Sequence, residues 1–299
     1  MTIAVKSPHI ISNLNGLCML TNIRILIEAC QSLSVEYEIL HPNQNLVKVR
    51  LSDRDYYFTN YATPLTSQAI AEIFKDKQYF YQVFQDVVKM PFTQSFISPY
   101  CDQKYLEYLK FTTINEIVEE IARCFELPII VKRNRGSGGN NVFKCEDLSQ
   151  TRLALETIFN VNLKSYDYIA LAQQPINIYK EYRCVYLNQE QVILYEKDIS
   201  QAMFVGNLSP LHWEGAIAKK VSDQQVIDKI NEFTKPIFQK MQITYVGLDV
   251  AVDHEGNYWL IEANSHPNFD IFIRDNGESM VIEMFEKILK HLYSKARFA

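Results

Sequence analysis

The segment from Tyr245 to Pro267 constrains the fold more than any other part of the sequence. Apolar residues recur at every second position on both sides of Glu255-Gly256, as in paired β-strands whose side chains point alternately to opposite faces. A hairpin that turns at Glu255-Gly256 predicts that Asp249 faces Glu262 and that Ala251 faces Leu260. One face of this hairpin would then be entirely apolar, with Leu248, Val250, Val252, Trp259, Ile261 and Ala263.

The opposite face of the predicted hairpin would carry Asp249, Glu262 and Asn264. Directly opposed side chains have Cβ atoms roughly 5 Å apart, and like charges at that distance are destabilising unless a cation compensates them. Carboxylate and amide oxygens are the hard ligands that Mg²⁺ prefers, usually together with phosphate oxygens and water. The pattern therefore predicts a magnesium site. Taken alone, a solvent-facing hairpin with acids on its wet side explains the segment equally well.

A glycine-rich loop follows an apolar strand predicted at Pro128–Val131. Lys132 ends this strand, and the loop then contains Gly136, Ser137, Gly138 and Gly139. Glycines let backbone N–H groups approach a polyanion closely, and the lysine supplies a point charge for phosphate. The order differs from the common nucleotide-binding loops, because the lysine precedes the glycines and a strand follows them. Taken alone, such a turn is most often only a mobile connection between two strands.

Composition and charge exclude several classes of protein. The 299 residues are 47% hydrophobic and 22% charged, which excludes collagen-like, low-complexity and largely disordered chains. The formal net charge of −5 argues against a nucleic-acid partner. No apolar run approaches the roughly 20 residues that span a bilayer, so no membrane partner is expected. The cysteines lack the spacing of a zinc knuckle or a redox pair and predict a cytoplasmic location: Cys18, Cys30, Cys101, Cys124, Cys145 and Cys184.

Hydrophobic periodicity predicts a mixture of helices and β-hairpins. The predicted helices cover about residues 15–33, 67–88, 114–125 and 226–241, and a last one begins at 281. The predicted strands cover about residues 35–39, 46–51, 56–60, 128–131, 142–144, 168–173, 182–187 and 191–195, besides the hairpin at the metal site. Helices that alternate with hairpins indicate α/β or α+β lobes.

Several segments, taken in order, resemble the ATP-grasp superfamily of carboxylate–amine ligases over roughly residues 70–272. They are Asp76-Lys77 at the head of a helix, Ile130-Val131-Lys132 before the glycine loop, the hinge strand Ala170–Ile176, Glu181-Tyr182-Arg183, Gly247-Leu248-Asp249, and Ile261–Pro267. The final Glu-x-Asn-x-x-Pro block with its upstream Asp is the most specific of these motifs. The Glu-Tyr-Arg block and the short first lobe look closest to the glutathione synthetase and ribosomal-protein glutamate ligase branch.

The resemblance implies a particular lobe organisation. An ATP-grasp fold would place a small N-terminal α/β lobe at residues 1–74, a central lobe with the glycine-rich lid at 75–174, and a C-terminal catalytic lobe with the metal site at 175–299. It also implies small-molecule or peptide substrates and a homodimer or homotetramer.

The resemblance further implies a role for each motif residue. Phosphates of ATP would contact Lys77 and Lys132 beneath the lid formed by Gly136, Ser137, Gly138 and Gly139. Adenine would lie against the backbone of Gln173, Gln174, Pro175 and Ile176, with the ribose on Glu181. The transferred phosphate or acyl group would face the catalytic residues Arg183, Lys197 and Asn207. Two Mg²⁺ ions, replaceable by Mn²⁺, would bind Asp249, Glu262 and Asn264. Taken singly, Lys77 and Glu181 are more simply solvated charges, and Arg183 could pair with a surface acid.

The implied reaction activates a carboxylate with ATP as an acyl phosphate and joins it to the amine of an amino acid or peptide. Two departures from the superfamily pattern bear on this expectation. Gln174 replaces an acid found in many relatives, and ATP binding should survive because the adenine contacts are mainly backbone. Val205 replaces an arginine found in some relatives, which leaves the acid substrate open. The alternatives are a nucleotide-binding regulatory module without turnover, and a ligase with a thiol or hydroxyl acceptor.

Overall fold

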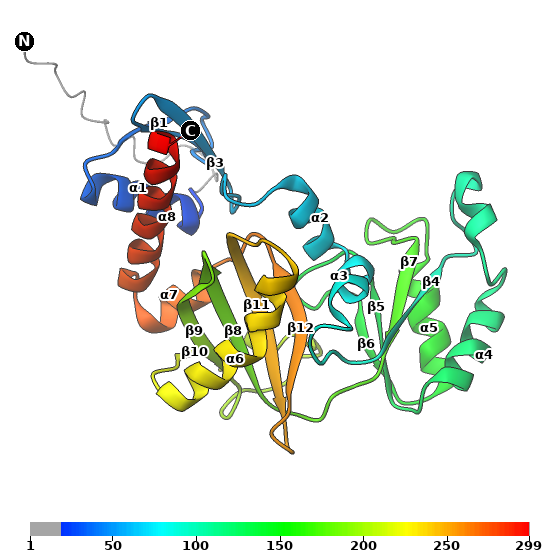
Figure 1. Cartoon of the computed structure of the whole chain (residues 1–299). Coiled ribbons are helices and arrows are strands. Elements are labelled where there is room, and N and C mark those ends of the chain that lie inside the picture. The colour runs from blue at the N-terminus through cyan, green and yellow to red at the C-terminus, as the bar shows by residue number, and fades with distance from the viewer. Residues whose placement is uncertain (1–18, 299) are drawn as a thin grey trace, which may run out of the picture.

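A computed structural model describes residues 19–298 of the chain and shows three antiparallel sheets with their helices (Figure 1). The first sheet has the order β1-β2-β3, with β1 at Glu36–Ile39, β2 at Leu46–Leu51 and β3 at Arg54–Thr59. Among the described helices, none is both long and apolar enough to cross a membrane.

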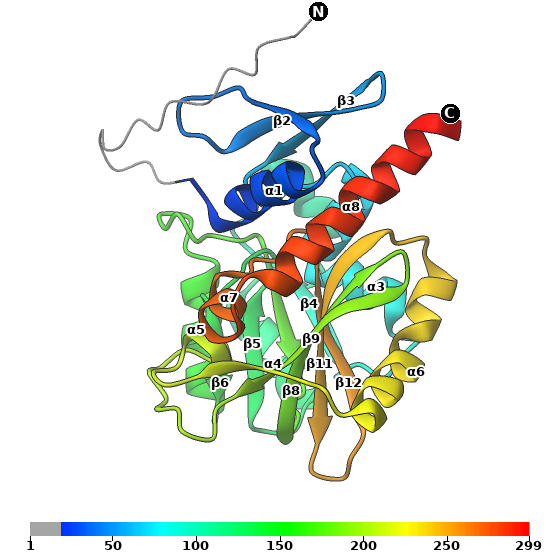
Figure 2. The same ribbon diagram turned by 90° about the vertical axis from the view of Figure 1, so that its left-hand side faces the viewer.

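The first lobe is completed by the other end of the chain. Helix α1 (Thr21–Ser32) packs beside helix α8 (Ser279–Phe298), as Figure 2 shows. Their apolar sides share one core with the first sheet, in which Leu26, Val47 and Ile288 are buried. The predicted first helix started at residue 15, and the part of it before residue 19 lies outside the described residues.

The predicted helix over residues 67–88 is in fact two helices, α2 (Gln68–Lys75) and α3 (Lys77–Phe84). Asp76 separates them with an extended backbone (φ −97°, ψ 105°), and its carboxylate accepts a hydrogen bond of 3.0 Å from the backbone N–H of Tyr79. Aspartate favours such caps over helix interiors, because its side chain bonds the free N–H groups of a helix start. The break makes Lys77 the first residue of α3.

The central sheet has the order β4-β7-β5-β6. Its strands are β4 (Thr93–Ile97), β7 (Ile169–Gln173), β5 (Ile129–Arg133) and β6 (Val142–Cys145). Helices α4 (Ile114–Cys124) and α5 (Leu148–Ile158) pack together with this sheet around one core, and a short 3₁₀ turn, η1, occupies Gln103–Tyr108. The sequence periodicity did not predict α5. This helix begins after Asp147, and the Asp147 carboxylate accepts a hydrogen bond of 2.8 Å from the backbone N–H of Gln150.

The largest sheet has the order β10-β9-β8-β11-β12. Its strands are β8 (Ile178–Leu187), β9 (Glu190–Asp198), β10 (Ile217–Lys220), β11 (Tyr245–Asp253) and β12 (Tyr258–Asn264). Helix α6 (Gln224–Lys240) shares a core with this sheet and with α2 and α3. A short 3₁₀ turn, η2 (Pro210–His212), and helix α7 (Asp270–Asn276) complete the lobe. Helix α8 packs with the first sheet, and α2 and α3 pack with the largest sheet, so these helices contact more than one predicted lobe. The predicted lobe boundaries stay predictions.

The β11–β12 hairpin confirms part of the predicted register and corrects the rest. Asp249 faces Glu262 as predicted. A bulge then shifts the pairing, so that Ala251 faces Trp259 and not Leu260. The extra residue of a bulge turns the following side chains to the other face. Leu260 and Tyr258 therefore pack with the core, whereas Ile261 lines a cavity, so the predicted apolar face was wrong at Trp259 and Ile261.

Candidate active site

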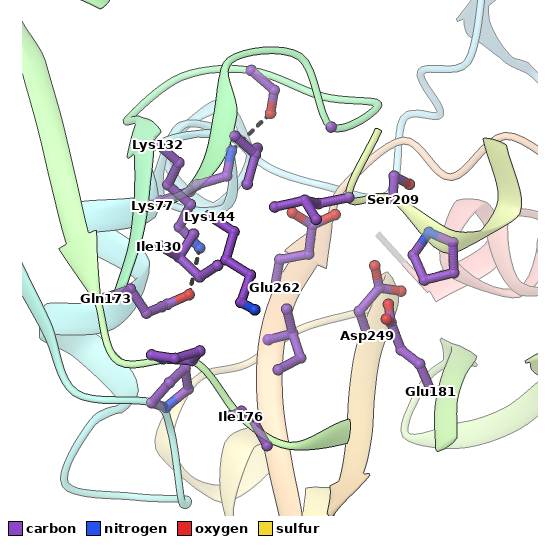
Figure 3. Close-up of a pocket in the computed structure, with 18 of the residues that line it drawn as sticks. Lys77, Ile130, Lys132, Lys144, Gln173, Ile176, Glu181, Ser209, Asp249 and Glu262 are labelled. Carbon is purple, nitrogen blue, oxygen red and sulfur yellow. Dashed lines mark hydrogen bonds between the residues drawn. The ribbon is translucent and has the colours of Figure 1, made fainter. Parts of the chain in front are cut away.

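A cavity of about 330 Å³ is lined by residues of the central sheet, the largest sheet and the glycine loop. Figure 3 shows Lys77, Lys132 and Gln173 along one wall, with Glu181, Asp249 and Glu262 on the facing wall. The residues predicted from sequence that line the cavity are Lys77, Lys132, Gly136, Ser137, Gly138, Gly139, Gln173, Gln174, Pro175, Ile176, Glu181, Lys197, Asp249 and Glu262. The predicted residues Arg183, Asn207 and Asn264 are not part of this lining.

The first wall carries two lysines that form no ion pair within the described residues. Lys77 Nζ donates to the carbonyl oxygen of Gly136 at 2.7 Å, and Lys132 Nζ donates to Oε1 of Gln173 at 2.8 Å. Neither amine forms an ion pair within the described part of the chain. Burial, together with the charge of Lys77, lowers the pKa of Lys132 to about 8, and burial also lowers the pKa of Lys77. This wall therefore favours a bound anion, which would offset the cost of desolvating two cations.

The hinge segment and several apolar residues contribute to the lining of the cavity. Ile130, Ile176 and Ile261 come from three different segments and all contribute to the lining. The hinge backbone is held in place because the N–H of Gln174 donates to the carbonyl oxygen of Phe92 at 2.9 Å. An apolar slot beside a backbone segment that is held in place suits a flat heteroaromatic ring.

The facing wall is organised around Asp249, whose exposed fraction is 2%. The Arg183 guanidinium donates to both carboxylate oxygens of Asp249, with Nη2–Oδ2 at 3.0 Å, and Lys197 Nζ donates to Oδ2 at 2.9 Å. Lys197 also pairs with Glu181. Burial alone would raise the pKa of Asp249. The charges of Arg183 and Lys197 outweigh this effect and hold the pKa of Asp249 well below its usual range. Burial raises the pKa of Glu181, and Lys197 offsets this only in part.

Two of the three predicted metal ligands line the cavity, and the third lies beside one of them. Asp249 and Glu262 are opposed in register, and both line the cavity. Asn264 Nδ2 lies 3.4 Å from Oε1 of Glu262, so the amide and this carboxylate are neighbours. Glu262 forms no ion pair with any described residue, although its charge acts on Lys77 and Lys132. A cluster of three or more His, Cys, Asp or Glu side chains in metal-binding geometry is absent from residues 19–298.

Asn207 was predicted to face the reacting groups, and here it contacts the glycine loop. Its Nδ2 donates to the carbonyl oxygen of Gly138 at 2.8 Å, and its Oδ1 accepts from the N–H of Ser209 at 2.7 Å. Gly139 has φ +71° and no room for a Cβ atom, because the Asn207 side chain occupies that space. The loop after β9 and the glycine loop therefore close over the cavity together.

Sequence reasoning missed several residues that line the cavity. They are Arg133, Lys144, Leu208, Ser209, Pro210 and Ile261, among others. Lys144 could have been found from the strand period, because Val142 and Lys144 point to the same side of β6. Ile261 could not, because the bulge that turns it into the cavity leaves no mark on the alternation of the sequence.

Comparison with known proteins identifies the family. A model of the RimK-like ATP-grasp domain matches residues 106–288, which is more than half of the chain, and the chain belongs to this family. The predicted α/β fold class and the predicted membership of the ATP-grasp ligase superfamily are thereby confirmed.

Individual proteins resemble the chain in sequence or in fold. An uncharacterized MG012 homolog from Mycoplasma pneumoniae is 28% identical over 153 residues, covering 51% of this chain and 48% of that protein. A bifunctional glutathione synthetase from Pasteurella multocida superposes with a TM-score of 0.51 at 13% identity, over 90% of this chain and 44% of its own. The VanG D-Ala:D-Ser ligase from Enterococcus faecalis gives a TM-score of 0.53 at 16% identity, over 74% and 62%. The chain thus spans about half the length of the curated relative, and the solved structures show a shared fold.

Proposed function

We propose that the chain is an ATP- and Mg²⁺-dependent ligase that activates a carboxylate as an acyl phosphate and joins it to an amine. The acid and the amine would be small molecules or peptides, and the products would be an amide, ADP and phosphate.

The cysteines support the cytoplasmic location that was predicted from sequence. Five of them in the described region are free thiols: Cys30, Cys101, Cys124, Cys145 and Cys184.

One observation carries this proposal: two lysines and a glutamate that form no ion pair within the described residues share one cavity. Lys77 and Lys132 lie on one wall and Glu262 lies on the other, where its charge only partly offsets theirs. A polyphosphate bound with divalent cations carries the charges that both walls lack. Mg²⁺ would be held by Asp249, Glu262 and Asn264, and it would neutralise phosphate charge.

The proposed chemistry needs positioning and charge neutralisation more than a protein nucleophile. A carboxylate oxygen of the acid would attack the terminal phosphorus, and the bond from that phosphorus to the ADP oxygen would break. The amine would then attack the acyl carbon, the carbon–oxygen bond to phosphate would break, and the amine would lose a proton. Lys77 and Lys132 would hold the phosphates, while the glycine loop would exclude water that otherwise hydrolyses the intermediate.

A screen of ADP release over amino acids and short peptides tests the proposal. We expect ADP release in the presence of ATP and Mg²⁺ only when both a carboxylate and an amine substrate are added. Binding of ATP without any ADP release, for any pair of amino acids or peptides, would favour the regulatory module. One observation supports that second candidate, because Arg183 and Lys197 already neutralise the predicted metal ligand Asp249.

The pair Glu262→Gln and Lys144→Gln provides a sharper comparison. Glu262→Gln removes a predicted metal ligand that has no ion-pair partner, so turnover should be lost while the fold persists. Lys144→Gln removes a charge from the same cavity that is already paired with Glu146 at 2.7 Å, and it should retain turnover at a reduced rate. ADP production at the normal rate in Glu262→Gln would contradict the proposal.

A further inference from the structure

Arg133 is the last residue of β5 and lies at the root of the glycine loop. It follows Lys132 directly, and its side chain contributes to the lining of the cavity. A Cβ atom at Gly136 would collide with the Arg133 guanidinium group, so the side chain passes directly against the backbone of that glycine. Lys77 Nζ donates to the carbonyl oxygen of the same residue. The first glycine of the loop is therefore contacted by two cations.

Arg133 is partly buried, and its guanidinium group has no hydrogen-bond or ion-pair partner among the described residues. Its Nε–H is buried without an acceptor, and the side chain forms no ion pair within the described residues. Asp167 is close enough to interact with Arg133 electrostatically, but its carboxylate already accepts from the N–H groups of Arg135 at 2.7 Å and Ile169 at 3.1 Å. Buried donors without acceptors are rare in folded proteins, and each such donor needs an explanation.

Arg135, two residues further along the chain, is a cation whose charge is paired within the protein. Arg135 pairs with Glu72 at 3.0 Å and with Asp76 at 3.4 Å, and it does not line the cavity. The two arginines are only two residues apart in the sequence, yet only Arg135 forms ion pairs. The difference indicates that the partner of Arg133 is not supplied by the protein.

We propose that Arg133 is a third phosphate-binding residue, which contacts the same polyphosphate as Lys77 and Lys132 from beneath the glycine loop. This inference rests on the proposed function, and it adds a residue that the sequence motifs did not assign. The planar guanidinium group presents several N–H donors in a fixed geometry that matches phosphate oxygens. The charge of Arg133 also contributes to lowering the pKa of Lys77, and a bound anion would offset this repulsion.

The test separates phosphate recognition from simple support of the loop. Dissociation constants for ATP, ADP and adenosine are measured calorimetrically with Mg²⁺ for the wild-type chain, Arg133→Gln and Arg133→Lys. We expect Arg133→Gln to weaken ATP and ADP binding about tenfold or more and to leave adenosine binding unchanged, because only the phosphates lose a charged hydrogen-bond donor. Arg133→Lys keeps the charge without the planar donor group and should recover part of the lost affinity.

Arg135→Gln is the matched control, because it removes the same charge two residues further along the chain. It should change ATP affinity by less than about threefold. Equal losses for ATP and adenosine in Arg133→Gln would show that Arg133 only supports the loop, and would overturn the inference. Normal ATP affinity in Arg133→Gln would overturn it too, while the proposed function would stand. A wild-type chain that binds no ATP would overturn both. If Arg133→Gln shows no thermal unfolding transition, Arg133→Met replaces it, because its unbranched side chain retains part of the aliphatic packing.

Discussion

Replacing Lys132 by methionine should stabilise the ligand-free protein while destroying its nucleotide affinity. Lys132 is 8% exposed, and burial together with the charge of Lys77 lowers its pKa from 10.5 to about 8. A lowering of this size means that keeping the amine charged in the folded state costs about 3 kcal/mol at neutral pH. The substitution removes this cost.

The net gain is smaller than 3 kcal/mol because Lys132→Met also removes a hydrogen bond. Gln173 Oε1 loses its donor, at a cost of about 1 kcal/mol, although the Gln173 side chain remains held through its bond to Thr93 at 2.7 Å. A net stabilisation of about 2 kcal/mol remains, which corresponds to a rise in melting temperature of about 4 to 8 °C.

The pH dependence of this gain follows from the direction of the pKa shift. The folded state holds the Lys132 proton less tightly than the unfolded state does, so the destabilisation is fully present below pH 8 and disappears as the pH rises towards 10.5. Melting temperatures of Lys132→Met and the wild type should therefore differ at pH 7 and converge near pH 10. Lys144→Met is the control, because Lys144 is half-exposed and paired with Glu146, and it should show no such gain.

Differential scanning fluorimetry without ligand measures these shifts, and calorimetry with ATP and Mg²⁺ measures affinity. A lower melting temperature for Lys132→Met at pH 7, or a gain that is the same at pH 7 and pH 10, would refute the reasoning. A stabilised variant that still binds ATP as tightly as the wild type would show that Lys132 does not contact the phosphates.

Further predictions concern the facing wall and the loop. Asp249→Asn should lower the free energy of unfolding by about 3 to 5 kcal/mol, because Arg183 and Lys197 would stay buried without their shared partner, and a denaturant titration measures this loss. Glu262→Gln removes a carboxylate that has no ion pair, so its unfolding midpoint should match the wild type although ADP release is lost. Equal destabilisation by both substitutions would contradict the described charge pairing. Gly139→Ala should weaken ATP binding in a calorimetric titration, because a methyl group is strained at φ +71° and would collide with the Asn207 side chain. Unchanged affinity would show that the closed loop is not the binding conformation.

Local patterns in the sequence were sufficient for much of the candidate site. The opposed pair Asp249 and Glu262 was predicted from a hairpin that turns at Glu255-Gly256, whereas the β-bulge between this pair and the turn was not predicted. The glycine loop between β5 and β6 could also be predicted locally, because its three glycines lie within four residues and the strand before it is apolar. The break at Asp76 was missed, since the apolar positions of α2 and α3 read as one helix and a single capping carboxylate separates them.

The charge balance of the site was decided only by the tertiary structure. Arg183 and Lys197 lie 66 and 52 residues before Asp249 and meet it only because β8 and β9 join β11 in one sheet. Whether Arg133 forms an ion pair depends likewise on which acids the fold brings near it. Arg135, two residues further on, forms ion pairs with two acids. Sequence determines which charges a strand presents and on which face, because that is a matter of local geometry. Whether each charge is neutralised by the protein or left for a ligand depends on distant segments, because electrostatic partners are set by packing.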